Sequence, residues 1–260
     1  MKKIILPVLF NLLIVSVVQA KVITTEVKYS EADQEFTSFI SYDDSIKGKR
    51  PGILVVHEWW GLSSYEKHRA EMLAKLGYVA IAVDMYGSGK LTDKPDQAKA
   101  WMQAVTTDIE WWRERAMMGI EQLEKHKLVD KNKLAAIGYC FGGGTVIQLA
   151  YGGADLKGIV SFHGALPIAD KENFGKIKAK MLMAHGNADP FIRRESLTKF
   201  QDTLDKAKAN WNMITYGNAR HSFTNPESDS HAMDALKYDK YADEHSWKAM
   251  QVFLDEIFEQ

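Results

Sequence analysis

The 260-residue chain has 46% hydrophobic and 26% charged residues, and its formal net charge is −1. This composition is typical of a folded globular protein long enough to build one large core. The small net charge comes from interspersed basic and acidic residues, which argues against a nucleic-acid-binding surface. The single cysteine excludes an internal disulfide.

Residues 1–20, MKKIILPVLFNLLIVSVVQA, have the three parts of a secretory signal peptide. Lys2 and Lys3 form the basic start, an apolar run follows, and a small residue, Ala20, closes the segment. The apolar run is short for a membrane-spanning helix, although an N-terminal anchor is the alternative. We therefore expect cleavage after Ala20 and export across a bacterial inner membrane, most simply to the periplasm.

From residue 21 to residue 260, short apolar runs alternate with amphipathic segments, with no repeat or linker. The expected strands are residues 22–30, 35–43, 52–57, 78–84, 133–138, 158–163, 180–186 and 211–216. The expected helices are residues 63–77, two pieces within 95–126, then 141–151, about 193–208, and 243–259. This alternation predicts a single α/β domain with a mostly parallel sheet and helices on both faces. Functional residues of such sheets gather at the carboxyl ends of the strands.

Cys140 lies in GYCFGGG, residues 138–144, between an expected strand and an expected helix. The chain must reverse direction there within about three residues, and Gly138 and Gly142 allow the close packing that such a turn requires. The following helix N-terminus favours a thiolate and a developing oxyanion. The sequence around Cys140 thus predicts a nucleophile elbow, while a buried cysteine at a glycine-rich packing site is the alternative.

Two further residues follow in the order nucleophile, acid, histidine that this architecture requires. Asp189, in AHGNADP, comes after one expected strand, and His221, in ARHSF, comes after the next. An imidazole could take the proton of Cys140, and a carboxylate could fix the tautomer of that imidazole. Separately, Asp189 could be a turn residue and His221 a solvated loop residue, but the ordered set favours catalysis.

The segment HEWWGL, residues 57–62, follows the first buried strand. This architecture places the second oxyanion donor there, so the backbone N–H groups of Trp59 and Phe141 are the candidate pair. Glu58 is a carboxylate at a strand end, where desolvation and a nearby thiolate would raise its pKa. A surface carboxylate and core aromatic side chains are the alternative interpretation.

HEWWGL, DMYG (84–87), GYCFGG (138–143), HGNADP (185–190) and HSF (221–223) resemble the motifs of the dienelactone hydrolase family of α/β hydrolases. The resemblance implies an α/β-hydrolase fold and a Cys140–His221–Asp189 triad, with the amides of Trp59 and Phe141 holding the oxyanion. It also implies that Glu58 interacts with the resting thiol and holds it poorly reactive until substrate binds.

The chain departs from the family at the two arginines that bind the carboxylate of dienelactone. Ser88 and Asn225 occupy the corresponding positions, and neither side chain can replace a bidentate guanidinium. Trp59, Trp60 and Tyr86 instead suggest an aromatic-walled pocket for a less charged ester or lactone, although Trp60 and Tyr86 could equally be structural.

We therefore expect an exported hydrolase that cleaves a small carboxylic ester or lactone through a thioester and needs no metal or cofactor. We expect a monomer that binds neither nucleic acid nor, after cleavage, the membrane. A non-catalytic envelope binding protein on the same scaffold is the alternative. A metal protein using His57, His163, His185 and His221 lacks ligand spacing, and a thiol redox protein would lack a resolving cysteine.

Overall fold

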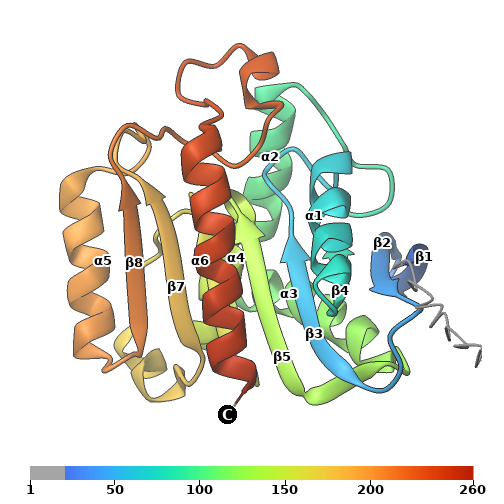
Figure 1. The fold of residues 1–260 in the computed structure, drawn as a ribbon. Coiled ribbons are helices and arrows are strands. Elements are labelled where there is room, and N and C mark those ends of the chain that lie inside the picture. The colour runs from blue at the N-terminus through green and yellow to red at the C-terminus, as the bar shows by residue number, and fades with distance from the viewer. Residues whose placement is uncertain (1–20, 260) are drawn as a thin grey trace, which may run out of the picture.

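The computed structural model describes residues 21–259. The expected signal peptide, residues 1–20, lies outside the described residues. The core of the fold is an eight-stranded sheet with the order β1-β2-β4-β3-β5-β6-β7-β8 (Figure 1). The strands are β1 Val22–Glu31, β2 Gln34–Asp43, β3 Arg50–Val56, β4 Val79–Val83, β5 Val129–Tyr139, β6 Gly158–Phe162, β7 Lys180–Gly186 and β8 Trp211–Tyr216.

The sheet is parallel from β4 through β8, and an antiparallel hairpin of β1 and β2 joins it at β4. The hairpin and the strand–helix alternation are confirmed. β5 begins four residues earlier than expected, because Val129 and Asp130 pair with the start of β3 before a register shift.

Six α-helices connect and cover the strands. They are α1 Ser64–Lys75, α2 Pro95–Thr106, α3 Ile109–Lys125, α4 Phe141–Gly152, α5 Arg194–Lys206 and α6 Lys240–Phe258. Helices α1 and α6 lie in front of the sheet in Figure 1, while α2, α3 and α4 lie behind it. The predicted α/β-hydrolase sheet with helices on both faces is thus confirmed as one domain.

The fold has two hydrophobic cores, one on each face of the sheet, because successive side chains of the central strands alternate between the faces. Leu54 and Val56 pack into the core shared with α2 to α5, whereas Ile53 and Val55 pack into the core shared with α1 and α6. Successive strand side chains point to opposite faces, so a sheet covered on both faces needs continuous apolar strands. The run GILVVH is such a strand.

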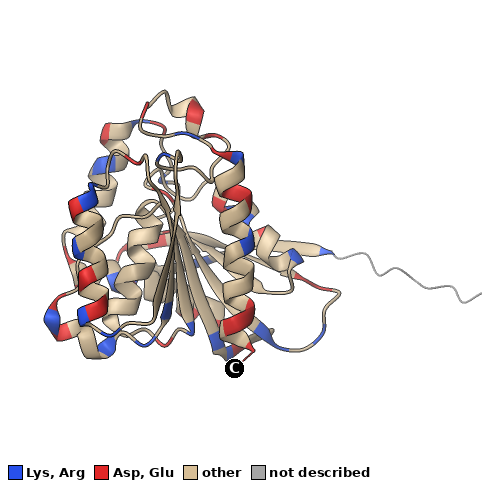
Figure 2. Ribbon diagram, turned by 60° about the vertical axis from the view of Figure 1, so that its left-hand side comes forward, with Lys and Arg blue, Asp and Glu red and all other residues tan. Residues whose placement is uncertain are grey.

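Figure 2 shows basic and acidic residues interspersed over the outer helices and loops that face the viewer. The N-terminus of α1 has a capping box, in which the Ser63 side chain accepts from the helix backbone and the Glu66 side chain accepts from the Ser63 N–H. Within residues 21–259, no helix is both long and apolar enough to cross a membrane.

Candidate active site

Cys140 lies at the sharp turn between β5 and α4. Its backbone is left-handed, with φ 55° and ψ −113°, a conformation that is strained for a side-chain-bearing residue. A Cβ on Gly142 would lie 2.2 Å from the carbonyl oxygen of Val56, and one on Gly138 would lie 2.0 Å from that of Gly142. Both glycines are therefore needed for β5, α4 and β3 to approach this closely, and together they build the elbow that holds the thiol above the sheet.

The structure brings His221 and Asp189 together with Cys140 from separate loops. Nδ1 of His221 lies 2.7 Å from Oδ2 of Asp189, and both side chains are buried. Oδ1 of Asp189 accepts the backbone N–H of Phe191 at 2.8 Å, which fixes the carboxylate. His221 and Cys140 line the same cavity.

The electrostatics of this cluster favour an imidazolium. Burial alone would lower the pKa of His221, but attraction to Cys140 and the hydrogen bond to Asp189 outweigh it and raise the pKa well above its ordinary value. His221 is therefore suited to take and hold the proton of the thiol, with Asp189 as the fixed acceptor of its other N–H.

The N–H groups of Trp59 and Phe141 are available to an oxyanion. Throughout residues 21–259, neither group donates to another backbone or side-chain acceptor outside regular helix and strand bonding. Phe141 is the first residue of α4, and the first N–H groups of a helix have no partner within it. The neighbouring Gly142 N–H, in contrast, is bonded to the carbonyl of His57 at 3.0 Å.

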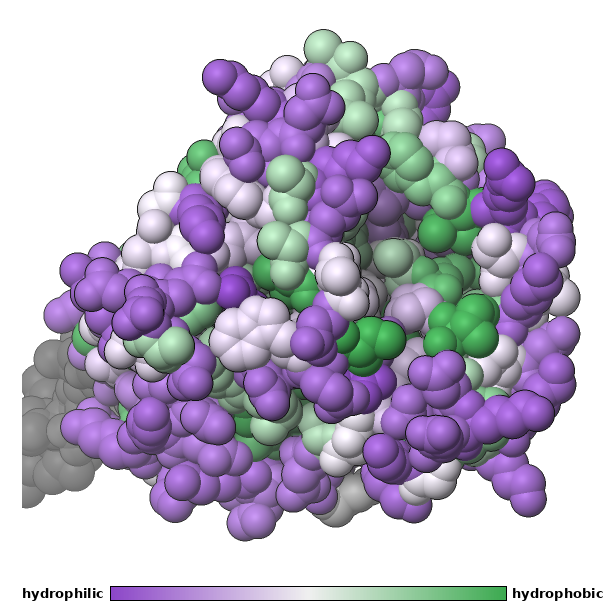
Figure 3. All heavy atoms as spheres, turned by 180° about the vertical axis from the view of Figure 1, so that it is seen from behind, coloured by the Kyte–Doolittle hydropathy of each residue, from purple (hydrophilic) through white to green (hydrophobic). Residues whose placement is uncertain are grey.

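An apolar cavity of about 320 Å³ lies over Cys140. Its lining comes from the turn after β3, from α2 and α4, and from the loops after β6, β7 and β8. The residues that line it are Trp59, Met102, Cys140, Phe141, Ala165, Phe191, Ile192, His221, Met233 and Leu236. Apart from the triad members Cys140 and His221, this lining is hydrophobic. Figure 3 shows hydrophobic residues gathered around a hollow in an otherwise largely hydrophilic face.

Glu58 is buried, and its carboxylate is engaged by two side chains of the loop after β8. It accepts hydrogen bonds from the hydroxyl of Ser222 and, at 2.8 Å, from Nδ2 of Asn225. No hydrogen bond between Glu58 and Cys140 occurs among residues 21–259, and the contact between Glu58 and the resting thiol stays a prediction. Burial, together with the Glu66 carboxylate, raises the pKa of Glu58 to about 7, and the two hydrogen bonds offset part of that rise.

Four of the expected pocket residues, Trp60, Tyr86, Ser88 and Asn225, do not line the cavity of Cys140. Asn225 binds Glu58 instead. Trp60 stacks on His231, with ring centroids 3.9 Å apart, and the two rings line a neighbouring hollow with Glu58. Tyr86 is buried, and its hydroxyl donates to the carbonyl of Trp59 at 3.1 Å, so it supports the pocket wall from behind.

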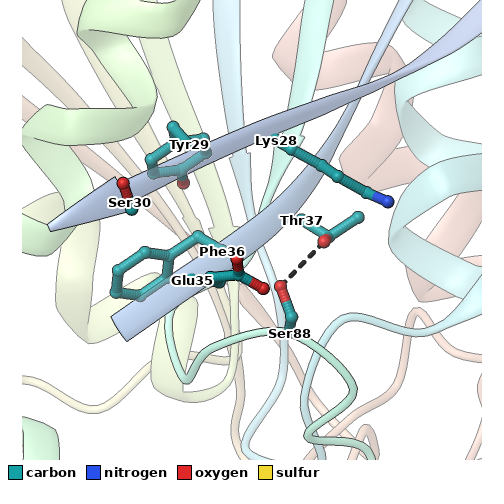
Figure 4. Close-up of a pocket in the computed structure, with 7 residues that line it drawn as sticks. All are labelled: Lys28, Tyr29, Ser30, Glu35, Phe36, Thr37 and Ser88. Atoms are coloured by element: carbon teal, nitrogen blue, oxygen red, sulfur yellow. Dashed lines mark hydrogen bonds between the residues drawn. The ribbon is translucent and has the colours of Figure 1, made fainter. Parts of the chain in front are cut away.

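Ser88, which was expected in the substrate pocket, lies against the β1–β2 hairpin. Oδ1 of Asp84 accepts the N–H groups of Tyr86 and Gly87, each at 2.9 Å, and the left-handed Gly87 turns the chain toward β2. The hydroxyl of Ser88 then pairs with that of Thr37 at 2.8 Å (Figure 4). The position of Ser88 is set by this turn, and Ser88 does not line the cavity over Cys140.

The sequence interpretation missed the role of His163, which underlies the elbow. The Nδ1 atom of His163 accepts the N–H of Cys140 at 3.2 Å, and Nε2 lies 2.7 Å from the hydroxyl of Thr224. Burial, followed by repulsion from His221, lowers the pKa of His163 well below its ordinary value. His163 is therefore a neutral support of the Cys140 backbone. Its position at the end of the strand next to β5 was the signal that could have identified it.

The four histidines weighed for a metal site do not converge on one point. Among the described residues, no group of three His, Cys, Asp or Glu side chains is arranged to hold a metal ion. His57 and His163 each engage both ring nitrogens in protein hydrogen bonds.

The sheet order, the strained elbow and the ordered acid and histidine define an α/β hydrolase. A model of the dienelactone hydrolase family matches residues 36–258. The chain therefore belongs to the dienelactone hydrolase family.

Known relatives cover nearly the whole chain. A dienelactone hydrolase-like promiscuous phosphotriesterase from metagenomic libraries is 35% identical, with a TM-score of 0.89, and 92% of this chain and 100% of that chain align. A protein called m3DLH is 36% identical, with a TM-score of 0.88, over 91% and 99% of the two chains. The "Probable 2-oxo-3-(5-oxofuran-2-ylidene)propanoate lactonase" of Bradyrhizobium sp is 25% identical over 80% of this chain and 85% of its own.

Proposed function

We propose that this protein hydrolyses uncharged carboxylic esters or lactones through a thioester on Cys140. The observation that carries the proposal is the Cys140–His221–Asp189 alignment beneath a hydrophobic cavity. The membership in a family of lactone and ester hydrolases supports the same chemistry. A carboxylate on the substrate would have no cationic partner in this cavity, because no lysine or arginine lines it.

In the proposed mechanism, His221 takes the proton of Cys140 and the thiolate sulfur attacks the substrate carbonyl carbon. The carbonyl π electrons move to oxygen, and the N–H groups of Trp59 and Phe141 stabilise that charge. When the tetrahedral intermediate collapses, the C–O bond to the alcohol breaks, and His221 protonates the departing oxygen. Water activated by His221 then hydrolyses the thioester, which releases the acid and restores the thiol.

The test is hydrolysis of p-nitrophenyl acetate, p-nitrophenyl butyrate and simple lactones by the wild-type protein and by Cys140→Ala. We expect the variant to lose roughly 10⁴-fold or more in kcat, because the nucleophile is removed while the cavity stays. Equal activity in both proteins would refute the thioester mechanism. A folded wild-type protein that binds but never hydrolyses the panel would favour the binding-protein alternative.

A second candidate is hydrolysis of a neutral phosphotriester. The 35% identical phosphotriesterase and the uncharged wall of the cavity favour it, since a triester carries no charge. The phosphoryl oxygen would occupy the place of the carbonyl oxygen at the Trp59 and Phe141 amides. Diethyl p-nitrophenyl phosphate belongs in the same panel, and turnover lost in Cys140→Ala would support this activity.

We also propose that the mature protein acts outside the inner membrane. The basic, apolar and small-residue parts of residues 1–20 support this. Mass spectrometry of the protein from a periplasmic extract should show a chain that begins at Lys21. A full-length chain in the membrane fraction would contradict cleavage.

A further inference from the structure

The peptide between Glu58 and Trp59 is fixed by a buried histidine that the proposed mechanism does not use. His57 directly follows β3 and is completely buried. Its Nδ1 lies 2.5 Å from the carbonyl oxygen of Glu58, and its Nε2 accepts the backbone N–H of Met85 at 3.2 Å. The ring is thus bonded on both sides to backbone.

These two bonds determine which nitrogen of His57 carries hydrogen. A backbone N–H can only donate, so Nε2 must present its lone pair to Met85. In a neutral imidazole the other nitrogen then bears the hydrogen, so Nδ1–H donates to the carbonyl of Glu58. Burial lowers the pKa of His57, which keeps the ring neutral and preserves this tautomer.

The orientation of the Glu58 carbonyl also sets the orientation of the Trp59 N–H. The C=O and N–H of one trans peptide unit point in opposite directions within a rigid plane. A carbonyl held toward His57 therefore aims the N–H of Trp59 away from His57. The carbonyl of Trp59 is held in turn by the hydroxyl of Tyr86 at 3.1 Å, so the backbone is anchored on both sides of the Trp59 N–H.

His57 also connects this peptide to the elbow. Its own carbonyl accepts the N–H of Gly142 at 3.0 Å, one residue beyond Phe141. One residue therefore touches both segments that carry the candidate oxyanion donors: its ring holds the Glu58–Trp59 peptide, and its backbone holds the start of α4.

We propose that His57 is a positioning residue that presents the Trp59 N–H to the oxyanion through its Nδ1–H bond to the Glu58 carbonyl. The inference rests on the proposed thiol hydrolase, and it adds a residue that neither contacts the substrate nor lines the cavity. If the bond is lost, the Glu58 carbonyl keeps only the longer bond from the Gly61 N–H, at 3.4 Å. The peptide is then held less firmly, and stabilisation of the transition state falls while substrate binding stays.

Two variants test the hydrogen bonds of the two ring nitrogens of His57 separately. H57N keeps a donor near the Nδ1 position and loses the acceptor for Met85, whereas H57Q keeps an acceptor near the Nε2 position and loses the short donor. We expect H57N to retain kcat for p-nitrophenyl butyrate within about threefold. We expect H57Q to lose roughly 10- to 100-fold in kcat with KM within twofold, because a misaligned donor approaches the effect of a removed one.

Alkylation of Cys140 by iodoacetamide supplies the readout that a merely structural role would not give. This displacement forms no oxyanion, so its rate should be equal in wild type, H57N and H57Q. A parallel loss of alkylation and hydrolysis, or an H57Q with wild-type kcat, would overturn the inference. A wild-type protein without thiol-dependent hydrolysis would instead refute the proposed function itself.

The wild-type protein offers a test that needs no variant. Long-range ¹⁵N–¹H spectra of the histidine rings should show His57 as the neutral Nδ1–H tautomer. An Nε2–H tautomer or an imidazolium near pH 7 would overturn the inference even if H57Q did not fold.

Discussion

Two hollows lie on either side of the turn after β3, and consecutive tryptophans face different ones. Trp59 lines the hydrophobic cavity over Cys140, whereas Trp60 lines a hollow with Glu58, Asp93, Glu227 and His231. The first hollow is lined by Cys140 and His221 and has no carboxylate in its lining. The second is lined by three carboxylates and has no thiol.

The comparison indicates how two buried carboxyl groups, those of Asp189 and Glu58, can have different roles. Asp189 is bonded to His221, which lines the cavity over Cys140. Glu58 is bonded to Ser222 and Asn225, and Glu58 and Asn225 line the polar hollow. In the proposed mechanism, His221 is therefore the acid and base in the cavity. Three predictions test this division, in order of decreasing expected effect.

The first prediction removes the carboxylate of the triad. Asp189→Asn should lower kcat for p-nitrophenyl butyrate by roughly 10³- to 10⁴-fold, because an amide no longer enforces the tautomer of His221 or stabilises its imidazolium. The loss of Asp189 should also lower the pKa of His221, which should shift the acid limb of the kcat profile toward lower pH. Circular dichroism controls for folding, and a loss below tenfold would mean that Asp189 is only a turn residue.

The second prediction places a cation in one hollow or the other. Met233→Arg adds a guanidinium at the partly buried rim of the cavity, and Ser230→Arg adds the same charge at the exposed rim of the polar hollow. Met233→Arg should shift the kcat/KM ratio of p-nitrophenyl hemisuccinate over p-nitrophenyl butyrate by about tenfold or more, since arginine binds carboxylate in two-point geometry. Ser230→Arg should leave the ratio within about twofold. Equal shifts in the two variants would show that net charge, rather than the cavity, selects the substrate.

The sequence predicts the elbow better than the pocket for a physical reason. The turn at Cys140 depends on glycines two residues away on either side, and the strands and helices depend on local periodicity. The side-chain direction of Glu58, in contrast, depends on Ser222 and Asn225, more than 160 residues later. Such a contact leaves no local pattern.

The position of Ser88 fails to follow from sequence for the same reason. Its place is set by Asp84, which turns the chain, and by the hairpin residue Thr37, whose hydroxyl it meets. The family resemblance matches Ser88 to a pocket position by its place in the sequence. Such a match does not predict the path of the loop that carries the residue. The placement of Cys140, Asp189 and His221 was predictable because all three follow strand ends of one parallel sheet, whereas their catalytic roles stay a prediction.

The third prediction concerns the buried carboxyl that faces the polar hollow. Its pKa of about 7 lies above its ordinary value of 4.5, so the folded state keeps Glu58 protonated where the unfolded chain ionises. The resulting destabilisation develops as pH rises from about 4.5 to about 7 and is fully present above that range. Glu58→Gln lacks this titration and can keep both hydrogen bonds, with its oxygen accepting from Asn225 and its NH₂ donating to Ser222.

We therefore expect the free energy of unfolding of Glu58→Gln to rise relative to wild type by about 2 kcal/mol between pH 5 and pH 8. Urea denaturation of both proteins at the two pH values measures this difference. Because the Glu58 carboxylate is hydrogen-bonded to Ser222 and Asn225, and not to Cys140, kcat of Glu58→Gln at pH 8 should stay within about threefold of wild type. A far larger change in kcat would mean that Glu58 leaves Ser222 and Asn225 during turnover and reaches the thiol. In that case the two hollows would share one acid, and the division between them would hold only for the resting protein.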